Sequence, residues 1–173
     1  MRVTDKFVFF FTKDDIFSNH YHQKNPITYG SFGGLMKFNT VEHYMMYEKA
    51  MLFDDKFIAC GILEAKTPQQ AKMLGRKVRN YDQAVWEENR EDIVTLGLVS
   101  KMLANDEIKD LALDYHLSGR RFVEASPYDA IWGIKMGEND PDVEDVTKWK
   151  GQNLLGNCWH KACRIYLNNL GVS

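Results

Sequence analysis

Hydrophobic residues in this chain fall into short continuous runs and longer stretches with a helical period. Residues 6–12 are β-branched and aromatic, which predicts a buried strand, and 121–125 predict a second, short one. The stretch 13–39 is polar and punctuated by glycines, which predicts loops with room for one short strand at 34–38. A long irregular segment of this kind inside a compact domain is usually functional.

Helical periodicity and capping residues account for most of the remaining chain. Thr40 is a good N-cap, Pro68 follows the cap Thr67 at a first helical position, and Gly119 is suited to the end of a helix. Ser126 opens a four-residue motif that is typical of a helix start. The expected helices are 40–50, one from 67, a stretch over 82–104 in two pieces with a break near 90–92, about 106–117, one starting at 126–129, and 152–169.

Helices therefore outnumber strands, and neither a repeat nor a linker interrupts the pattern. We expect a mostly helical α+β fold with a few short strands, formed by a single domain over 1–173. A chain of 173 residues buries roughly 70% of its extended surface, which is enough for one hydrophobic core.

Composition narrows the classes of protein. Hydrophobic residues make up 45% and charged residues 27%, which are globular values. A net charge of −2 argues against a dedicated binder of duplex DNA but leaves room for a local basic pocket. No apolar run approaches the roughly 20 residues of a membrane span, and residues 1–6 open no signal peptide. Three sparse cysteines indicate reduced thiols, so we expect a cytoplasmic protein.

Charged residues at helical spacing supply the first candidate chemistry. Glu42 and Lys49 are seven residues apart, on one helical face, where they can line a pocket or simply complement the helix dipole. Lys72, Arg76 and Arg79 also share a face, which can hold phosphate or can be an ordinary solvated surface.

A second group of candidates lies in strands and loops. Glu124 sits in an apolar strand, where a carboxylate is costly unless it is paired or protonated, so a site and a structural pair with an arginine both remain open. Asp129 and Trp132 belong either to a pocket rim or to a capping box with a core tryptophan. Ser18 and Asn19 carry a hydroxyl and an amide that can bind ribose or phosphate.

Metal binding is not expected. His20 and His22 lack further ligands at a suitable spacing, and Cys158 and His160 point apart on their helix. The acidic loop 138–145 has neither the glycine nor the terminal glutamate of an EF-hand.

Taken in order, these motifs resemble the NADAR family, whose best-known members are the YbiA-like N-glycosidases. The resemblance spans about 17–167. The chain departs from the family pattern at Lys135, where a glycine is usual, and at Ser118-Gly119, which stands for Thr-Gly. The matching blocks are Phe17-Ser18-Asn19, Glu42-His43-Tyr44-Met45, Lys49-Ala50, Phe53-Asp54, Ala71-Lys72, Leu74-Gly75-Arg76, Trp86, Val123-Glu124-Ala125-Ser126-Pro127, Asp129, Trp132-Gly133, Trp149-Lys150-Gly151-Gln152-Asn153-Leu154-Leu155-Gly156 and Arg164.

The resemblance implies hydrolysis at the anomeric carbon of a sugar, with nitrogen as the leaving atom. The substrate it implies is a phosphorylated N-riboside, such as a ribosylaminopyrimidine phosphate of the riboflavin pathway, and the product is ribose 5-phosphate. One alternative is an ADP-ribosyl hydrolase that acts on guanine in DNA or RNA. Another is a non-catalytic module that binds ADP-ribose or a nucleotide.

If the chain acts as the resemblance implies, we expect it to need no cofactor and no metal. The sequence does not indicate an oligomeric state. We expect Glu42 and Asp129 to form the chemical pair, with Glu124 as a third acid. The expected substrate-binding residues are Trp86 and Trp132 for stacking on the base, Lys49, Lys72 and Arg76 for phosphate, and Ser18, Asn19 and Asn153 for hydrogen bonds to ribose or phosphate.

Overall fold

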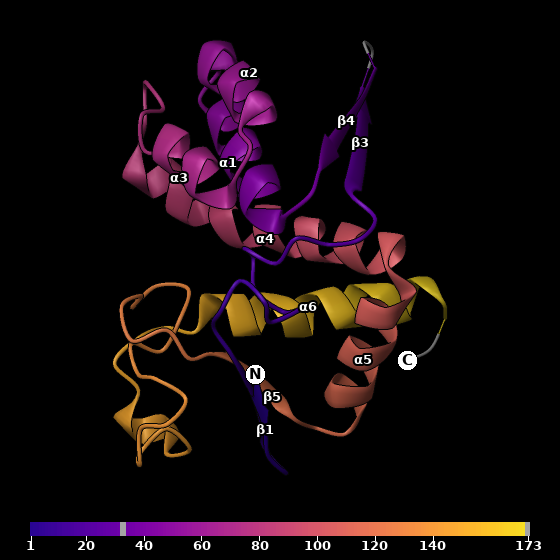
Figure 1. The fold of residues 1–173 in the computed structure, drawn as a ribbon, viewed down its shortest axis with the longest axis vertical. Helices are drawn as coiled ribbons and strands as arrows, with labels where there is room; N and C mark the ends of the chain where they lie inside the picture. Colours follow the sequence, from indigo (N-terminus) through magenta and orange to yellow (C-terminus); the bar gives the residue numbers. More distant parts are fainter. Residues whose placement is uncertain (32–33, 172–173) are drawn as a thin grey trace.

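The structure is a computed structural model that describes residues 1–31 and 34–171 (Figure 1). Helices make up most of its regular structure, so the mostly helical α+β prediction is confirmed. The elements within these residues are β1 (Arg2–Val3), β2 (Phe7–Phe10), β3 (Ile27–Ser31), β4 (Gly34–Phe38), α1 (Val41–Leu52), α2 (Lys56–Glu64), α3 (Pro68–Gly75), α4 (Gln83–Ala104), α5 (Asp106–Leu117), β5 (Arg121–Glu124), the 3-10 helix η1 (Val146–Lys148) and α6 (Leu154–Asn169).

The strands form two small sheets. In the first, β1 pairs antiparallel with β2, and β2 pairs parallel with β5, with Phe7 opposite Arg121 and Phe10 opposite Glu124. In the second, β3 and β4 form an antiparallel pair. Because β2 and β5 are parallel, both strands end at the same edge, and Glu124 lies at that edge.

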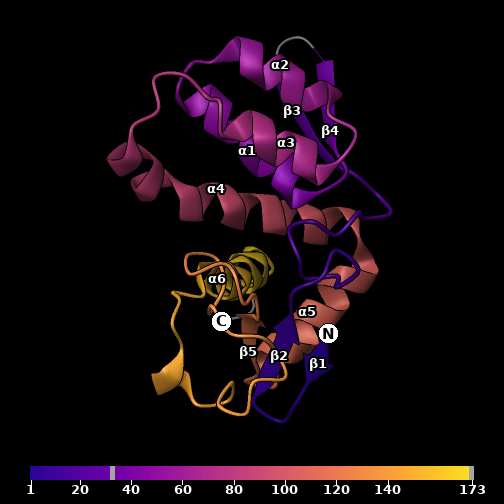
Figure 2. The ribbon, with the colours of Figure 1, turned by 60° about the vertical axis from the view of Figure 1, so that its left-hand side comes forward.

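The helices are stacked around α4 (Figure 2). The helices α1 and α3 lie on one side of α4, and α2 packs against both of them, farther from α4. The helix α6 packs along the other side of α4 and also covers β5. The last helix starts two residues later than predicted, because Asn153 adopts a left-handed backbone with φ of 54°.

Aromatic rings fill the centre between α4, α6 and the first sheet. Phe17 is fully buried, and its ring meets the rings of Trp159 and Phe122 edge-on at centroid distances of 4.9 Å and 5.1 Å. A second, smaller apolar cluster lies around Phe7, Phe9, Val123, Ala125, Ile134, Met136 and Val143, with Trp149 packed against it.

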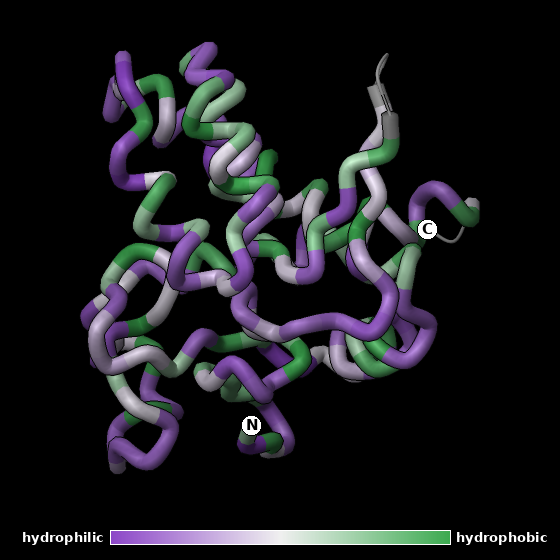
Figure 3. Tube along the Cα trace, turned by 45° about the horizontal axis from the view of Figure 1, so that its top comes forward, coloured by the Kyte–Doolittle hydropathy of each residue, from purple (hydrophilic) through white to green (hydrophobic). Residues whose placement is uncertain are grey.

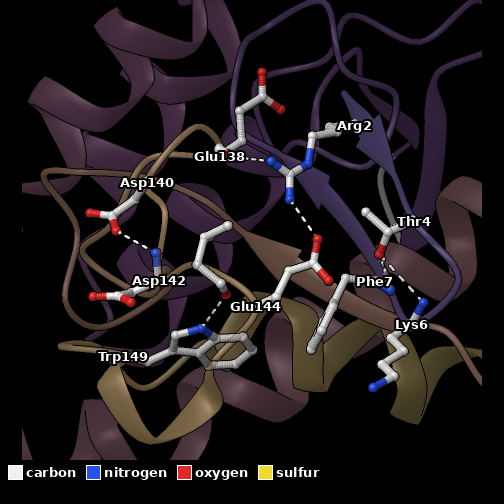
Figure 4. A network of polar contacts seen from close by, with 10 residues as sticks. Arg2, Thr4, Lys6, Phe7, Glu138, Asp140, Asp142, Glu144 and Trp149 are labelled. Atoms are coloured by element: carbon white, nitrogen blue, oxygen red, sulfur yellow. Dashed lines mark hydrogen bonds and ion pairs between the residues drawn. The ribbon is translucent and has the colours of Figure 1, made fainter.

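The acidic loop 138–145 is tied to this second cluster (Figure 4). Arg2 donates to the backbone carbonyl of Glu138 at 2.7 Å and pairs with Glu144 at 2.8 Å. The indole N–H of Trp149 donates to the carbonyl of Val143 at 2.8 Å. The loop is therefore held by backbone and side-chain contacts from both of its flanks.

Two predictions about helices are wrong. The break near 90–92 does not exist, because Arg90 is buried and continues the stripe of Trp86 and Val94 through an unbroken α4. No helix starts at Ser126 either. Its hydroxyl accepts the N–H groups of Tyr128 and Asp129, as in a cap, but the chain then continues as successive turns.

Four elements had no counterpart in the prediction, namely β1, β3, α2 and η1. Hydrophobic and polar segments alternate along the described part of the chain trace (Figure 3). None of the helices in the described ranges combines the length and the apolar character needed to cross a bilayer. The cysteines are free thiols, with Cys60 exposed and Cys158 and Cys163 buried.

Candidate active site

Glu42 is placed in the first turn of α1, where the hydroxyl of Thr40 caps the helix by accepting the N–H of His43 at 3.2 Å. The Glu42 side chain is 3% exposed, and its Oε1 is buried without a hydrogen-bond partner. Its Oε2 lies 3.6 Å from Nε2 of His20. A carboxyl group in this position is poorly solvated and poorly paired.

The surroundings of Glu42 favour its protonated form. Burial raises the pKa of Glu42 from 4.5 to about 7, the positive charge of Lys72 opposes that rise, and the negative charge of Asp129 adds to it. Burial, followed by the charge of Lys72, lowers the pKa of His20 to about 4. His20 is therefore neutral near pH 7 and does not form an ion pair with Glu42.

Glu124 enters the same neighbourhood from the end of β5. Burial raises its pKa to about 8, the charges of Asp129 and Glu42 add to the rise, and the charge of Lys72 opposes it. Its Oε2 is buried and has no hydrogen-bond partner. The three candidate carboxyl groups, from a helix, a strand and a turn, thus lie close enough to act on one another's charge, with Lys72 beside them.

The turn after β5 fixes Asp129. Its Oδ1 accepts the N–H groups of Ile131 at 2.8 Å and Trp132 at 2.9 Å. The turn folds back on the strand, since the N–H of Ile134 donates to the Glu124 carbonyl at 3.0 Å. A Cβ at Gly133 would lie 2.8 Å from that carbonyl oxygen, so only glycine allows this approach. The approach brings Asp129 next to Glu124.

The helix α3 brings Lys72 and Arg76 over α1. The two helices touch at Gly75, where a Cβ would lie 2.1 Å from Sδ of Met46. Lys72 is half-buried and Arg76 is exposed at the C-terminal end of the helix. Because α3 lies this close to α1, the charges of both cations reach Glu42.

Lys49 completes the positive side of the site. Its Nζ lies 4.3 Å from the ring centroid of Tyr81 and 5.3 Å from that of Trp86. Burial lowers the pKa of Lys49, and the charge of Arg76 lowers it further. Within residues 1–31 and 34–171, Lys49, Lys72 and Arg76 form no ion pair with a carboxylate. Cations that gather without a counterion suit an anionic ligand.

The structure gives three of the predicted binding residues internal contacts. Trp86 is 7% exposed and belongs to the main core, so little of its ring is open to a base. The Ser18 hydroxyl accepts the N–H of His20 at 3.1 Å. Asn153 is 1% exposed, and its amide donates to Phe122 O at 2.9 Å and accepts the N–H of Glu124 at 3.0 Å. These contacts use the Ser18 hydroxyl as an acceptor and the Asn153 amide as both donor and acceptor.

Asn19 and Trp132 have side-chain surface that is not used by internal contacts. The Oδ1 of Asn19 is buried and has no partner, while its backbone carbonyl accepts the N–H of Glu42 at 2.9 Å. Trp132 is half-buried, and its backbone N–H donates to the Asp129 side chain. Both residues therefore adjoin the carboxyl groups.

Sequence reasoning missed residues that border the site. His20 was weighed only as a metal ligand, although it directly follows Ser18-Asn19 in the sequence. Arg90 was assigned to a helix break, yet it is buried one turn after Trp86, and its Nε has no hydrogen-bond partner. In the described ranges, no three His, Cys, Asp or Glu side chains are arranged to hold a metal ion.

The fold is similar to that of a solved protein. An NMR structure of the E. coli protein YbiA covers 98% of this chain and 90% of its own, with a TM-score of 0.71 and 24% sequence identity. The family is shown by sequence, because residues 8–164 match the model of the NADAR domain. The chain therefore belongs to the NADAR family, as the motifs predicted.

Three further proteins are similar to this chain in sequence. An N-glycosidase of Acanthamoeba polyphaga mimivirus is 34% identical over 158 residues, which cover 88% of this chain and 92% of the relative. The protein irg-1 of Caenorhabditis elegans is 33% identical over 165 residues, covering 88% and 76%. An N-glycosidase of Nostoc punctiforme is 31% identical over 109 residues, covering 63% and 67%.

Proposed function

We propose that this chain is an N-glycosidase that hydrolyses the C1′–N bond of a phosphorylated N-riboside. The names of two of its relatives support a hydrolase of N-glycosyl bonds in general. The observation that carries the proposal is the convergence of Glu42, Glu124 and Asp129 beside Lys72.

The proposed chemistry needs one acid and one carboxylate. Breaking a C1′–N bond leaves positive charge on the ribose and negative charge on the departing nitrogen, as in other glycoside hydrolyses. Glu42, whose pKa of about 7 lies near neutral pH, is protonated in part of the molecules there, and this form delivers its proton to that nitrogen. The carboxylate of Asp129 stabilises the ribosyl cation and orients water, whose oxygen bonds to C1′ while its proton passes to Asp129.

Glu124 is the third acid in this scheme. Burial and the neighbouring carboxylates raise its pKa to about 8, so it stays protonated when Asp129 is charged. A neutral Glu124 adds no third negative charge beside Glu42 and Asp129 during the reaction. It also offers a hydrogen-bond donor to a ribose hydroxyl, since its Oε2 has no internal partner.

The substrate class follows from the groups around the acids. Lys49, Lys72 and Arg76 are assigned to the phosphate, because they gather without carboxylate partners. Trp132 is assigned to the base, since an aromatic face binds a flat heterocycle with ~1–3 kcal/mol per base. Asn19 is assigned to the ribose through its free amide oxygen. A ribosylaminopyrimidine phosphate of the riboflavin pathway has all three parts, and its cleavage releases ribose 5-phosphate.

The test is an incubation of the purified protein with a ribosylaminopyrimidine 5′-phosphate and, separately, with an oligonucleotide carrying ADP-ribosylated guanine. We expect ribose 5-phosphate from the first substrate. Release only from the second, with a KM that rises steeply with salt, would favour the nucleic-acid hydrolase instead. Binding of ADP-ribose without any product would favour the non-catalytic module.

A further inference from the structure

Lys101 is a lysine at the centre of the molecule, on α4, and it is 0% exposed. Its Nζ donates to the backbone carbonyls of Ile16 at 2.5 Å and Ser18 at 3.2 Å. The same nitrogen lies 5.2 Å from the ring centroid of Tyr21 and 5.4 Å from that of Trp159. Within the described residues Lys101 forms no ion pair, and burial lowers its pKa to about 7.

The neighbouring carbonyls of the same segment are bound as well. The indole N–H of Trp159, on α6, donates to Phe17 O at 2.8 Å. The N–H of Glu42, on α1, donates to Asn19 O at 2.9 Å. Every backbone carbonyl from residue 16 to residue 19 therefore accepts a hydrogen bond from a group outside the segment, and the donors come from three different helices.

This arrangement explains why a lysine occupies a fully buried position on α4, next to the buried Leu98 and Met102. The Ile16 and Ser18 carbonyls face the same side, and a single donor can serve both only if it carries several N–H bonds on a long stem. A leucine or methionine at position 101 would leave the Ile16 carbonyl without a partner and the Ser18 carbonyl with only the N–H of Tyr21 at 3.2 Å, which is unfavourable. The segment that Lys101 holds leads directly into Asn19 and His20, which border Glu42.

We propose that Lys101 is a positioning residue, which holds the 16–19 segment so that Asn19 and His20 meet Glu42 in the geometry that the reaction needs. The inference rests on the proposed function for its effect on catalysis. It acts through two contacts, the Asn19 carbonyl with the Glu42 N–H and the His20 ring 3.6 Å from the Glu42 carboxyl group. Lys101 itself touches neither the carboxyl groups nor, by this account, the substrate.

The first experiment substitutes Lys101→Met, which keeps the length of the side chain and removes its donors. We expect a folded protein whose kcat falls by about 100-fold, the scale expected when a reacting group is misplaced by about 1 Å. Lys101→Arg keeps the donors and should restore part of the rate. The matched control is Lys161→Met. It removes a different hydrogen-bonded lysine, which lies on α6 and donates to Glu91, and it should leave kcat unchanged.

A double-mutant cycle separates positioning from general stability. If Lys101 acts through His20, then Lys101→Met and His20→Ala should be strongly non-additive in kcat/KM, because the second change removes the ring that the first displaces. Additive effects, or a wild-type kcat in Lys101→Met, would overturn the inference. If Lys101→Met does not fold, then Trp159→Phe, which loses the donor to Phe17 O together with part of a buried ring, takes its place in the cycle and must show the same non-additivity.

Amide hydrogen exchange tests the same inference without any substrate. Lys101→Met should speed exchange at the Glu42 N–H and across residues 16–20, while amides in the middle of α6 keep their protection. Unchanged exchange at Glu42 would contradict the positioning role. A wild-type protein that cleaves no N-riboside would sink the proposed function, whereas the exchange result would still decide what Lys101 holds.

Discussion

Replacing Glu42 by glutamine should abolish turnover and at the same time stabilise the fold. The substitution keeps the size of the side chain but carries no ionisable group into the buried site, where Oε1 of Glu42 has no partner. The wild-type protein must either hold a proton on Glu42 or bury its charge. Glu42→Gln therefore removes the free-energy cost of burying an ionisable carboxyl group. The proposed function needs that carboxyl group, so stability and activity should change in opposite directions.

The size of the effect follows from the pKa of Glu42, which burial raises from 4.5 to about 7. That difference corresponds to a cost of about 3 kcal/mol. Because the folded state binds the proton more tightly than the unfolded state, this cost is absent below pH 4.5 and grows as the pH rises toward 7. Above pH 7 it is fully present. The gain in Glu42→Gln should therefore be small at pH 5 and close to its maximum at pH 8.

The assay is urea denaturation of both proteins at pH 5 and pH 8, with the rate of N-riboside cleavage measured in parallel. Glu88→Gln, at an exposed position on α4, is the control for removing a negative charge and should change neither stability nor rate. If Glu42→Gln is no more stable than the wild type at pH 8, or gains equally at both pH values, then the buried Glu42 carboxyl group does not destabilise the fold in this way.

Three further outcomes follow from the same site. Asp129→Asn should lower kcat by about 10²–10⁴; an unchanged kcat would remove Asp129 from the chemistry. Lys72→Met should raise the pKa of Glu42 further, because the charge of Lys72 lowers it. The alkaline limb of the pH–rate profile should then move to higher pH, and the KM for the phosphorylated substrate should rise. A limb that moves to lower pH would contradict this. Dialysis against EDTA should leave the rate unchanged, and a loss that a divalent ion restores would contradict the metal-free scheme.

Local sequence patterns were sufficient for the elements whose ends carry strong signals. Thr40 and Thr67 cap α1 and α3 as expected, and the 7–10 and 121–124 runs form strands. The helix α2 escaped prediction because Gly61 lies in its interior and its cap, Asp55, is also bound by the distant Arg79. Such a long-range contact leaves no periodic trace in the sequence.

The candidate carboxyl groups were found because a buried acid in an apolar setting is costly, an argument that applies residue by residue. The convergence of these carboxyl groups in space could not be predicted from the sequence by the same argument. It depends on the parallel pairing of β2 with β5 and on the turn at Gly133. The internal contacts of Asn153 and the burial of Trp86 likewise arise only when distant segments meet.

Release of ribose 5-phosphate from a ribosylaminopyrimidine 5′-phosphate shows directly whether the protein is an N-glycosidase for this class of substrate. It should be followed for the wild-type protein, for Asp129→Asn and for Glu88→Gln in the same buffer. We predict steady release by the wild type and by Glu88→Gln, and a rate lower by about 10²–10⁴ for Asp129→Asn. Equal release by the wild type and Asp129→Asn, or no release by the wild type, would contradict the account.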